Sequence, residues 1–362
     1  MARPNEKVSS VIKMLALPFV TVIMPVRNES SFIRRSLTTV TSQDYDQSRM
    51  EIIVVDGMST DDTPELVKAF AFEHSNLRLI QNPGRIAPVG LNLAVAEARG
   101  EIIIRVDGHC EIASDYVRRC VEHLVGDGVD AVGGPIETVG ETPIARIVSL
   151  AMSSHFGVGG SSFRTLRDQS ALVDTVPFPG YTRKAIEKAG LFDEELVRNQ
   201  DDEYNYRLRK LGGRILLSPK IRSRYYSRSS LRSLWSQYFQ YGYWKVRVMQ
   251  KHWRQMRIYQ FAPALFSAAL LFSLLLSPFS VFSRLIFVLI VGSYAVANVI
   301  ASVATLQMKD WLKVPLLSLS FAILHLSYGV GFLYGLVYFH NRWRSDERSP
   351  QFPQATETPG RA

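Results

Sequence analysis

Short runs of aliphatic and β-branched residues alternate with helical stretches through the first third of the chain. The apolar runs lie at residues 20–24, 51–55, 77–81, 102–106 and, more briefly, 131–133. Between them, residues 30–41, 60–73 and 88–98 carry apolar positions at helical spacing. This alternation predicts stacked βα units, and therefore an α/β fold with a mostly parallel sheet.

After residue 134 the alternation loosens. Residues 156–162 and 176–180 are rich in glycine and proline and predict turns. Residues 182–189 and 202–211 predict helices, and residues 214–217 predict a strand. Residues 230–250 predict an amphipathic helix rich in aromatic side chains, which either lies in a membrane interface or packs on the preceding domain as an ordinary helix.

Three long apolar runs follow, at residues 260–277, 285–308 and 314–339, and none contains Lys, Arg, Asp or Glu. Each approaches the roughly 20 residues needed to cross a bilayer, so we expect three membrane helices. A buried helical domain is the alternative, which the length of two runs disfavours. Basic and aromatic anchors flank the set, at Lys251, Trp253, Arg254, Arg342 and Trp343.

An odd number of membrane crossings conflicts with the positions of the cationic residues. Three crossings would place the tail opposite the N-terminal domain, yet cationic residues that favour the cytoplasmic side lie at both ends. A re-entrant or interfacial segment would remove the conflict. We expect a multi-pass protein of the inner (cytoplasmic) membrane, with the large domain facing the cytoplasm.

Charge and cysteine content refine this expectation. The formal net charge is +9, and basic residues are dense between Arg198 and Arg257, near the first apolar run. Anionic lipid headgroups explain that density better than nucleic acid. Cys110 and Cys120 have no zinc-ligand spacing and make no disulfide framework, which suits a reducing cytosol. Residues 1–17 lack a good apolar signal core, so no cleaved export signal is expected.

Polar residues follow the predicted strands. Arg27, Asn28 and Glu29 follow the first, Asp56 the second, and Asp107, Gly108 and His109 the fourth. Parallel strands bring these ends to one edge, where α/β sheets bind ligands. Oxygen ligands suit Mg²⁺ or Mn²⁺, and Mn²⁺ also accepts an imidazole. Asp107 is the first candidate ligand, whereas Asp56 is equally explained as a turn residue and His109 as a backbone hydrogen-bonding partner.

A second acidic cluster, Asp201, Asp202 and Glu203, opens a predicted helix. The helix dipole alone explains carboxylates in a first turn, but one of them also suits a general base that takes a proton from a hydroxyl. The Walker phosphate loop is missing, and the glycine-rich dinucleotide fingerprint does not follow the first strand. ATP hydrolysis and hydride transfer are therefore disfavoured.

Together these motifs resemble the family 2 inverting glycosyltransferases of the GT-A fold over residues 19–250. The resemblance is carried by Val22 to Glu29, by Val54 to Asp61, by Asp107 to His109 at the Asp-x-Asp position, and by Gln200 to Gly212. Gly57, His109 and Gln200 depart from the family pattern. The resemblance implies a GT-A domain whose mixed, mostly parallel sheet has helices on both faces, followed by C-terminal transmembrane helices.

The resemblance also implies roles for individual residues. The donor would be bound by Pro25, Arg27, Asn28, Glu29, Asp56, Asn92 and Asp107. Asp107 and His109 would hold Mg²⁺ or Mn²⁺, and Asp201 would be the catalytic base. On the acceptor side we expect Asp202, Trp235, Tyr243 and Trp244, although packing at the membrane interface explains the aromatic side chains more simply. The implied domain limits are 1–18 (lead segment), 19–229 (GT-A domain), 230–257 (interfacial helix), 258–340 (membrane domain) and 341–362 (tail).

Within the family, the motifs are most similar to succinoglycan-type glucosyltransferases. That similarity implies transfer of a hexose such as glucose from a nucleotide-sugar, a UDP-sugar first, to a polyprenyl-diphosphate-linked saccharide in exopolysaccharide biosynthesis. Such an enzyme would work beside partner glycosyltransferases of the same pathway. Two alternatives remain: a processive polysaccharide synthase, although Gln240 to Trp244 lack the arginine of the Gln-x-x-Arg-Trp motif, and a non-catalytic nucleotide-binding membrane scaffold.

Overall fold

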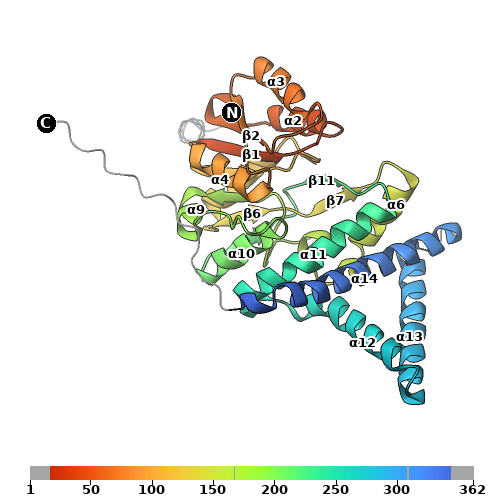
Figure 1. The fold of residues 1–362 in the computed structure, drawn as a ribbon. Coiled ribbons are helices and arrows are strands. Elements are labelled where there is room, and N and C mark those ends of the chain that lie inside the picture. Colours follow the sequence, from red (N-terminus) through yellow and green to blue (C-terminus); the bar gives the residue numbers. More distant parts are fainter. Residues whose placement is uncertain (1–16, 167, 308–309, 344–362) are drawn as a thin grey trace.

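The structure is a computed structural model that describes residues 17–343, apart from residues 167, 308 and 309. Most of the expected lead segment (1–18) and tail (341–362) therefore lies outside the described residues. The described chain forms an α/β domain from which a group of long C-terminal helices extends (Figure 1).

The central sheet has eight strands in the order β3-β2-β1-β4-β9-β6-β10-β8. The parallel core consists of β1 (Val20–Val26), β2 (Met50–Asp56), β3 (Leu77–Gln81) and β4 (Ile102–Arg105). β9 (Gly180–Thr182) runs antiparallel to both β4 and β6 (Ala131–Gly133), while β10 (Ile215–Leu217) is parallel to β6 and antiparallel to β8 (Ala171–Leu172). The mixed, mostly parallel sheet is thus confirmed.

Helices cover both faces of this sheet, because alternate strand residues point to opposite sides. Val22 and Met24 share a core with α2 (Ile33–Thr41), α3 (Thr63–Glu73) and α5 (Tyr116–Gly126). Ile23 lies in a second core, with α4 (Ala87–Glu97), α9 (Arg183–Ala189) and α10 (Gln200–Lys210).

A second sheet of three strands was not predicted. It pairs β5 (Cys110–Ile112), β11 (Ser223–Tyr226) and β7 (Ile136–Val139), with β11 in the middle. Strands of three or four residues are too short to show a clear alternation of polar and apolar positions. The remaining short elements are the 3₁₀ turn Gln47–Arg49 and the helices α6 (Pro143–Ser153), α7 (His155–Val158) and α8 (Ser162–Thr165).

The C-terminal part consists of α11 (Leu231–His252), α12 (Ala262–Leu276), α13 (Val281–Thr305) and α14 (Val314–Tyr338). Short 3₁₀ turns connect or extend them at Trp253–Gln255, Ile258–Phe261, Trp311–Lys313 and His340–Arg342. Three of the described helices are long and apolar enough to cross a membrane: Ile258–Leu276, Val281–Thr305 and Trp311–Tyr338. The second begins earlier than expected and includes Arg284.

Glycines allow α14 to pack closely against its neighbours. A Cβ atom at Gly331 would lie 2.1 Å from the Phe239 carbonyl oxygen of α11, and one at Gly242 would lie 2.0 Å from the Tyr328 carbonyl oxygen of α14. On another side of α14, a Cβ at Gly329 would lie 2.3 Å from the Pro263 carbonyl oxygen of α12. Side chains at these positions would force the helices apart, so the glycines fix how α11, α12 and α14 meet.

Candidate active site

The turns after β1 and β2 form one hydrogen-bonded unit. Asn28, whose φ is 55°, accepts a hydrogen bond from the Thr60 amide through Oδ1 (2.8 Å), and its own amide donates to Ser59 Oγ (2.9 Å). Asp56 is buried and accepts from the amide (3.1 Å) and hydroxyl (2.5 Å) of Ser59. The predicted donor residues Asn28 and Asp56 are therefore brought together, although their contacts equally fit the turn role considered for Asp56.

Arg27 fills the space beside Gly57, where the family pattern has a second aspartate. Its Nη1 donates to the Arg85 carbonyl oxygen (3.4 Å). A Cβ at Gly57 would lie 3.1 Å from that same oxygen and 3.3 Å from the Cβ of Arg27. An aspartate would be crowded here, which gives a steric reason for the glycine. Pro25 lies within β1, paired with Val55 of β2.

Arg105, the last residue of β4, holds Asp107. Its Nε and Nη2 donate to the two carboxylate oxygens of Asp107, at 2.9 and 3.3 Å. Burial opposes the charge of Arg105, but the carboxylates of Asp107 and Asp201 outweigh it and raise the pKa of the guanidinium. Asp107 thus has the positive partner that its place at a strand end requires. Arg105 was not predicted as a site residue, although a cation at the end of an apolar strand is a signal that the sequence contains.

His109 faces Glu29 rather than Asp107. Its Nδ1 lies 2.8 Å from Glu29 Oε1, and its ring meets Tyr225 edge to face at 5.3 Å between centroids. No group of three or more His, Cys, Asp and Glu side chains within the described ranges has the geometry to hold a metal ion by itself. Mg²⁺ in nucleotide sites, however, commonly takes one or two protein ligands and completes its shell with phosphates and water. Asp107 and His109 line one cavity and would be the protein ligands of a site of that kind, in place of the contacts that they make here with Arg105 and Glu29.

Asp201 lies in the first turn of α10. Burial, and next the charge of Asp202, raise the pKa of its carboxyl; Asp107 acts in the same direction and Arg105 opposes it. Asp202 points to Lys245 of α11 and forms an ion pair with its buried ammonium group. A buried carboxylate with a raised pKa is a stronger proton acceptor than an ordinary aspartate once it is ionised.

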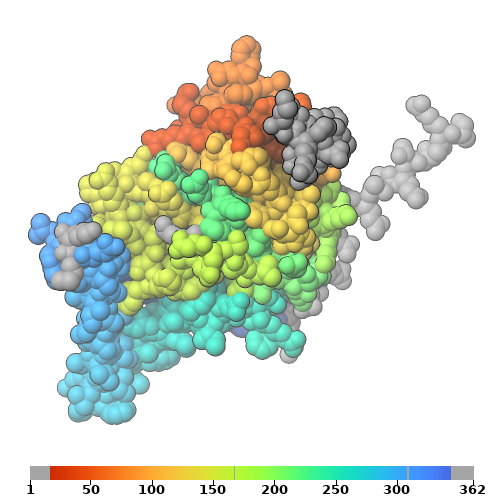
Figure 2. All heavy atoms as spheres, turned by 180° about the vertical axis from the view of Figure 1, so that it is seen from behind, coloured from red at the N-terminus to blue at the C-terminus, as the bar shows by residue number. Residues whose placement is uncertain are grey.

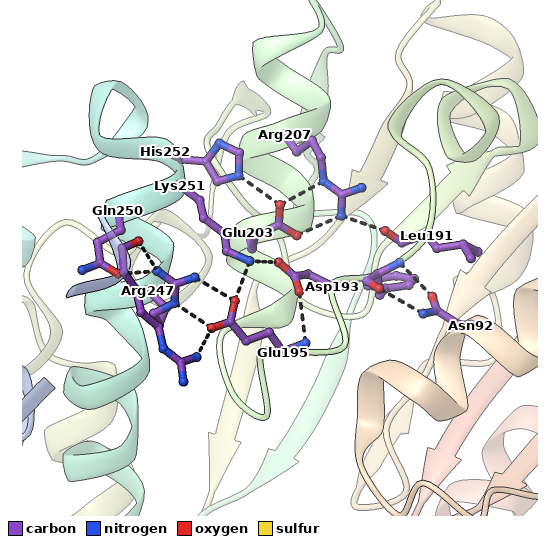
Figure 3. Close-up of polar contacts among 12 residues, drawn as sticks. Asn92, Leu191, Asp193, Glu195, Glu203, Arg207, Arg247, Gln250, Lys251 and His252 are labelled. Carbon is purple, nitrogen blue, oxygen red and sulfur yellow. Dashed lines mark hydrogen bonds and ion pairs between the residues drawn. The ribbon is translucent and has the colours of Figure 1, made fainter. Parts of the chain in front are cut away.

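A network of ion pairs holds the loop that leads into α10 (Figure 3). Glu195 binds Arg247 through two contacts of 2.8 Å and Lys251 at 2.9 Å. Glu203, two residues beyond Asp201, binds both Arg207 and His252 at 2.9 Å. Because these partners come from α10 and α11, the network fixes the start of α10 against the long helix.

Asn92 belongs to the support of this loop. Its side chain exchanges hydrogen bonds with the backbone of Phe192, at 2.9 Å to the carbonyl and 2.7 Å from the amide, and donates to Glu194 (2.8 Å). Asn92 is buried and does not line the cavity described next. Asn92, which was predicted to bind the donor, thus holds the loop before α10 by hydrogen bonds to residues about 100 positions away in the sequence.

A cavity of about 620 Å³ is lined both by the α/β domain and by the long apolar helices. Asp107, His109 and Asp201 belong to its lining. So do Phe266 of α12, Tyr294 of α13 and Tyr328 of α14. Charged side chains of the domain and side chains of all three apolar helices therefore share one cavity.

Helix α11 contributes a different face to this cavity from the one predicted. Gln237, Tyr238, Tyr241 and Lys245 line it. Trp235 is exposed, and Tyr243 and Trp244 pack instead on Phe339, with ring centroids 4.8 and 5.7 Å away. Of the expected acceptor-side residues, only Asp202 lines the cavity. The four-residue spacing of Gln237, Tyr241 and Lys245 places them on one face of the helix and was a signal for this lining. Aromatic residues also lie on the other faces of α11, so composition alone did not single this face out.

Cationic side chains also line the cavity. Arg164 donates to Thr138 Oγ1 (3.1 Å), and Arg198 donates to Gln240 (3.1 Å). Arg228 follows β11 and has no hydrogen-bond or ion-pair partner in the described part of the chain. An unpaired arginine beside a cavity is a natural binding group for phosphate.

Comparisons with known proteins agree with this geometry. The family described as "Glycosyl transferase family 2" matches residues 21–190. The "Succinoglycan biosynthesis protein ExoA" of Rhizobium meliloti (strain 1021) is 30% identical over 341 residues, which cover 89% of this chain and 96% of that protein. A dolichyl-phosphate-sugar glucuronosyltransferase of Methanococcus voltae is 30% identical over 241 residues, covering 64% of this chain and 74% of that protein.

Among solved structures, the mannosyltransferase PcManGT of Pyrobaculum calidifontis, in complex with GDP-Man and Mn²⁺, is similar with a TM-score of 0.57. The match covers 92% of this chain and 94% of that one at 20% sequence identity. At that identity the likeness concerns the fold: a GT-A sheet followed by helices.

Proposed function

Because the chain belongs to glycosyl transferase family 2, we propose that it transfers a single hexose, glucose first among the candidates, from a nucleotide-sugar to a polyprenyl-diphosphate-linked saccharide. The anomeric configuration of the sugar is inverted. The reaction takes place at the cytoplasmic face of the inner membrane, within exopolysaccharide biosynthesis. A UDP-sugar is the first donor to test, and GDP-mannose the second, since a structural relative binds it.

The continuous cavity carries this proposal. Asp107 and Asp201, two of the carboxylates that line it, are in electrostatic contact through Arg105. Residues of all three apolar helices line the same cavity. A water-soluble acceptor would have no need of apolar walls, whereas a sugar on a lipid carrier needs both environments. Arg228 and Arg164 supply positive charge for the diphosphate of such a carrier.

In the proposed reaction, Asp201 takes the proton of the acceptor hydroxyl while the oxygen attacks the anomeric carbon of the donor. The bond from that carbon to the diphosphate oxygen breaks from the opposite side, and the nucleoside diphosphate leaves with the bonding electrons. Asp107 and His109 would hold Mg²⁺ or Mn²⁺, which neutralises charge on the diphosphate when bound. The β1 and β2 turns, with Pro25, Arg27, Asn28, Glu29 and Asp56, would position the nucleoside.

The test is a screen of radiolabelled nucleotide-sugars against lipid extract from membranes, with purified full-length protein. One donor should label a lipid-soluble product, and Asp201→Asn should lower the rate by about 10²–10⁴-fold, the usual contribution of a general base. Asp62→Asn is the matched control, because Asp62 caps α3 without a side-chain hydrogen bond and does not line the cavity. Near-normal transfer by Asp201→Asn would remove Asp201 from the base role. Absence of any labelled lipid across the donors would favour the scaffold alternative.

A further inference from the structure

The three apolar helices differ in how much of their surface the protein covers. In the most apolar window of Trp311–Tyr338, 44% of residues are buried, against 17% in Ile258–Leu276 and 11% in Val281–Thr305. Figure 1 shows α14 running along α11, while α12 and α13 lead away from the domain. Figure 2 shows α13 (blue) standing out from the body of the molecule.

The first half of α14 packs on the catalytic domain. Leu317, Phe321 and Leu324 belong to the same apolar core as strand β1. The ring of Phe321 meets that of Phe156 at 5.0 Å, and His325 Nε2 hydrogen-bonds to the Phe156 carbonyl oxygen (2.8 Å). Phe156 belongs to α7, which follows directly on α6 of the domain.

The second half and the end of α14 also stay on the domain. Gly331 and Gly335 lie against the backbone of α11, at Phe239 and Tyr243. Beyond the helix, the Phe339 carbonyl oxygen accepts from Gln250 (2.9 Å), and Arg342 binds Glu195 (2.9 Å). This end of α14 is therefore joined to the ion-pair network that supports the active site.

Contact along the whole length is incompatible with a crossing. A helix of 25 residues is about 37 Å long, at about 1.5 Å per residue. If α14 spanned a hydrocarbon core about 30 Å thick, the domain surface beside it would be carried through the core as well. That surface includes Glu195, Arg247 and Lys251, whose charges are costly in hydrocarbon.

The outer face of α14 is apolar along the same length. Leu319, Val330 and Val337 are 48%, 42% and 73% exposed. At about 100° per residue they point within about 20° of one direction. Tyr334 is also exposed and points within about 60° of this stripe, at about 100° per residue. Aromatic side chains of this kind are enriched at the level of lipid headgroups.

We propose that α14 lies flat in the membrane interface on the side of the catalytic domain, with its apolar stripe in the lipid, and that only the α12–α13 hairpin enters the hydrocarbon core. Trp343 is then on the same side of the membrane as the catalytic domain. With two crossings in place of three, the cationic residues at both ends of the helical region lie on the same side of the membrane. It does not depend on the proposed reaction.

Depth measurements test the position of α14. Spin labels are attached singly to Leu319→Cys, Val330→Cys and Val337→Cys in full-length protein reconstituted in phospholipid vesicles, after Cys110 and Cys120, both buried, are replaced by serine. Accessibility to oxygen and to a water-soluble nickel complex gives the depth of each label. We expect three equal, shallow depths. A spanning helix would separate the labels at 319 and 337 by about 27 Å along the membrane normal, at about 1.5 Å per residue, and would overturn the proposal.

Sidedness provides the second test. In sealed vesicles, an impermeant maleimide is added to Trp343→Cys and, as the reference for the catalytic domain, to Phe72→Cys, whose side chain is 94% exposed. We expect both cysteines to be labelled to the same fraction before detergent is added. Labelling of Trp343→Cys only from the face opposite Phe72→Cys would overturn the proposal. Neither test measures transfer, so a failed donor screen would leave this inference unaffected.

Discussion

The ionisation of Asp201 determines the pH range in which the proposed base works. Because burial and Asp202 raise its pKa, transfer should be lost as pH falls through that raised value, above the usual range of an aspartate. For stability the sign is opposite: a carboxyl with a raised pKa in the folded state favours folding when protonated. At neutral pH, where the ionised carboxyl disfavours folding, Asp201→Asn should therefore have a thermal midpoint equal to or above that of the wild type, which separates loss of catalysis from loss of fold.

Asp202 gives a way to move that pH limit. Asp202→Asn removes a neighbouring negative charge and frees the positive charge of Lys245, and both changes lower the pKa of Asp201. The acidic limb of the pH profile of kcat should move to lower pH. The measurement is the rate of transfer at saturating donor and acceptor across pH 4 to 8, with Asp62→Asn as the control. An unmoved acidic limb would mean that another group sets it.

Arg228 should act on the acceptor and not on the donor. Arg228→Ala removes a cation of the cavity that has no hydrogen-bond or ion-pair partner among the described residues, and a charge-assisted contact of this kind contributes about 1.5–3 kcal/mol. The KM for the lipid-linked acceptor should rise by about 10- to 100-fold, while the KM for the donor stays unchanged. Arg232→Ala, at an exposed position of α11, is the control. A rise in donor KM alone would assign Arg228 to the nucleotide-sugar.

At the scale of elements, the glycine contacts between α11 and α14 are the most sensitive to substitution. Gly331→Leu places side-chain atoms where the Phe239 carbonyl oxygen lies, and overpacking of this kind costs about 3 kcal/mol. Gly292→Leu is a matched control within α13, because a Cβ there meets no atom within 4 Å. The thermal midpoint in detergent should fall for Gly331→Leu and stay constant for Gly292→Leu. Equal midpoints for the two variants would contradict the close packing.

The ion-pair network should make the stability of α10 and α11 depend on pH. Burial raises the pKa of Glu195, but Arg247 and Lys251 outweigh it and lower the pKa to about 2. The stabilisation is therefore complete above the unfolded value of about 4.3 and is lost as pH falls toward 2. Glu195→Gln removes the carboxylate that binds Arg247 and Lys251, at a cost of about 3 kcal/mol, and should flatten the acid decline of the thermal midpoint.

The control for this variant is Glu97→Gln. Glu97 is exposed and pairs with Arg78, whose side chain is 40% exposed, and surface pairs contribute at most about 1 kcal/mol. Its midpoint and its pH dependence should match the wild type. If Glu195→Gln behaved in the same way, the network would be a surface feature without a role in placing the start of α10.

For the molecule as a whole, the sequence was informative where a signal is local. Strands β1, β2 and β4 are buried on both faces and appear in the sequence as apolar runs, and the carboxylates that follow β2 and β4 were found for the same reason. Contacts between segments distant in the sequence could not be predicted from it. Lys245 binds Asp202 across 43 positions, and Asn92 binds Phe192 across 100. The short strands of the second sheet and the cavity face of α11 were missed because no periodicity distinguishes them.

The architecture also bears on whether the enzyme adds one sugar or many. Secretion of a growing polymer needs a channel enclosed by several membrane helices, but α13 is exposed to its surroundings along most of its length and α14 packs on the domain. The cavity, of about 620 Å³, is large enough for a few sugar units and not for a chain. With excess donor, mass spectrometry of the lipid-linked product should therefore show the acceptor plus one hexose. A ladder of products differing by one hexose would instead establish a processive synthase, and titrating the donor from limiting to hundredfold excess distinguishes the two outcomes.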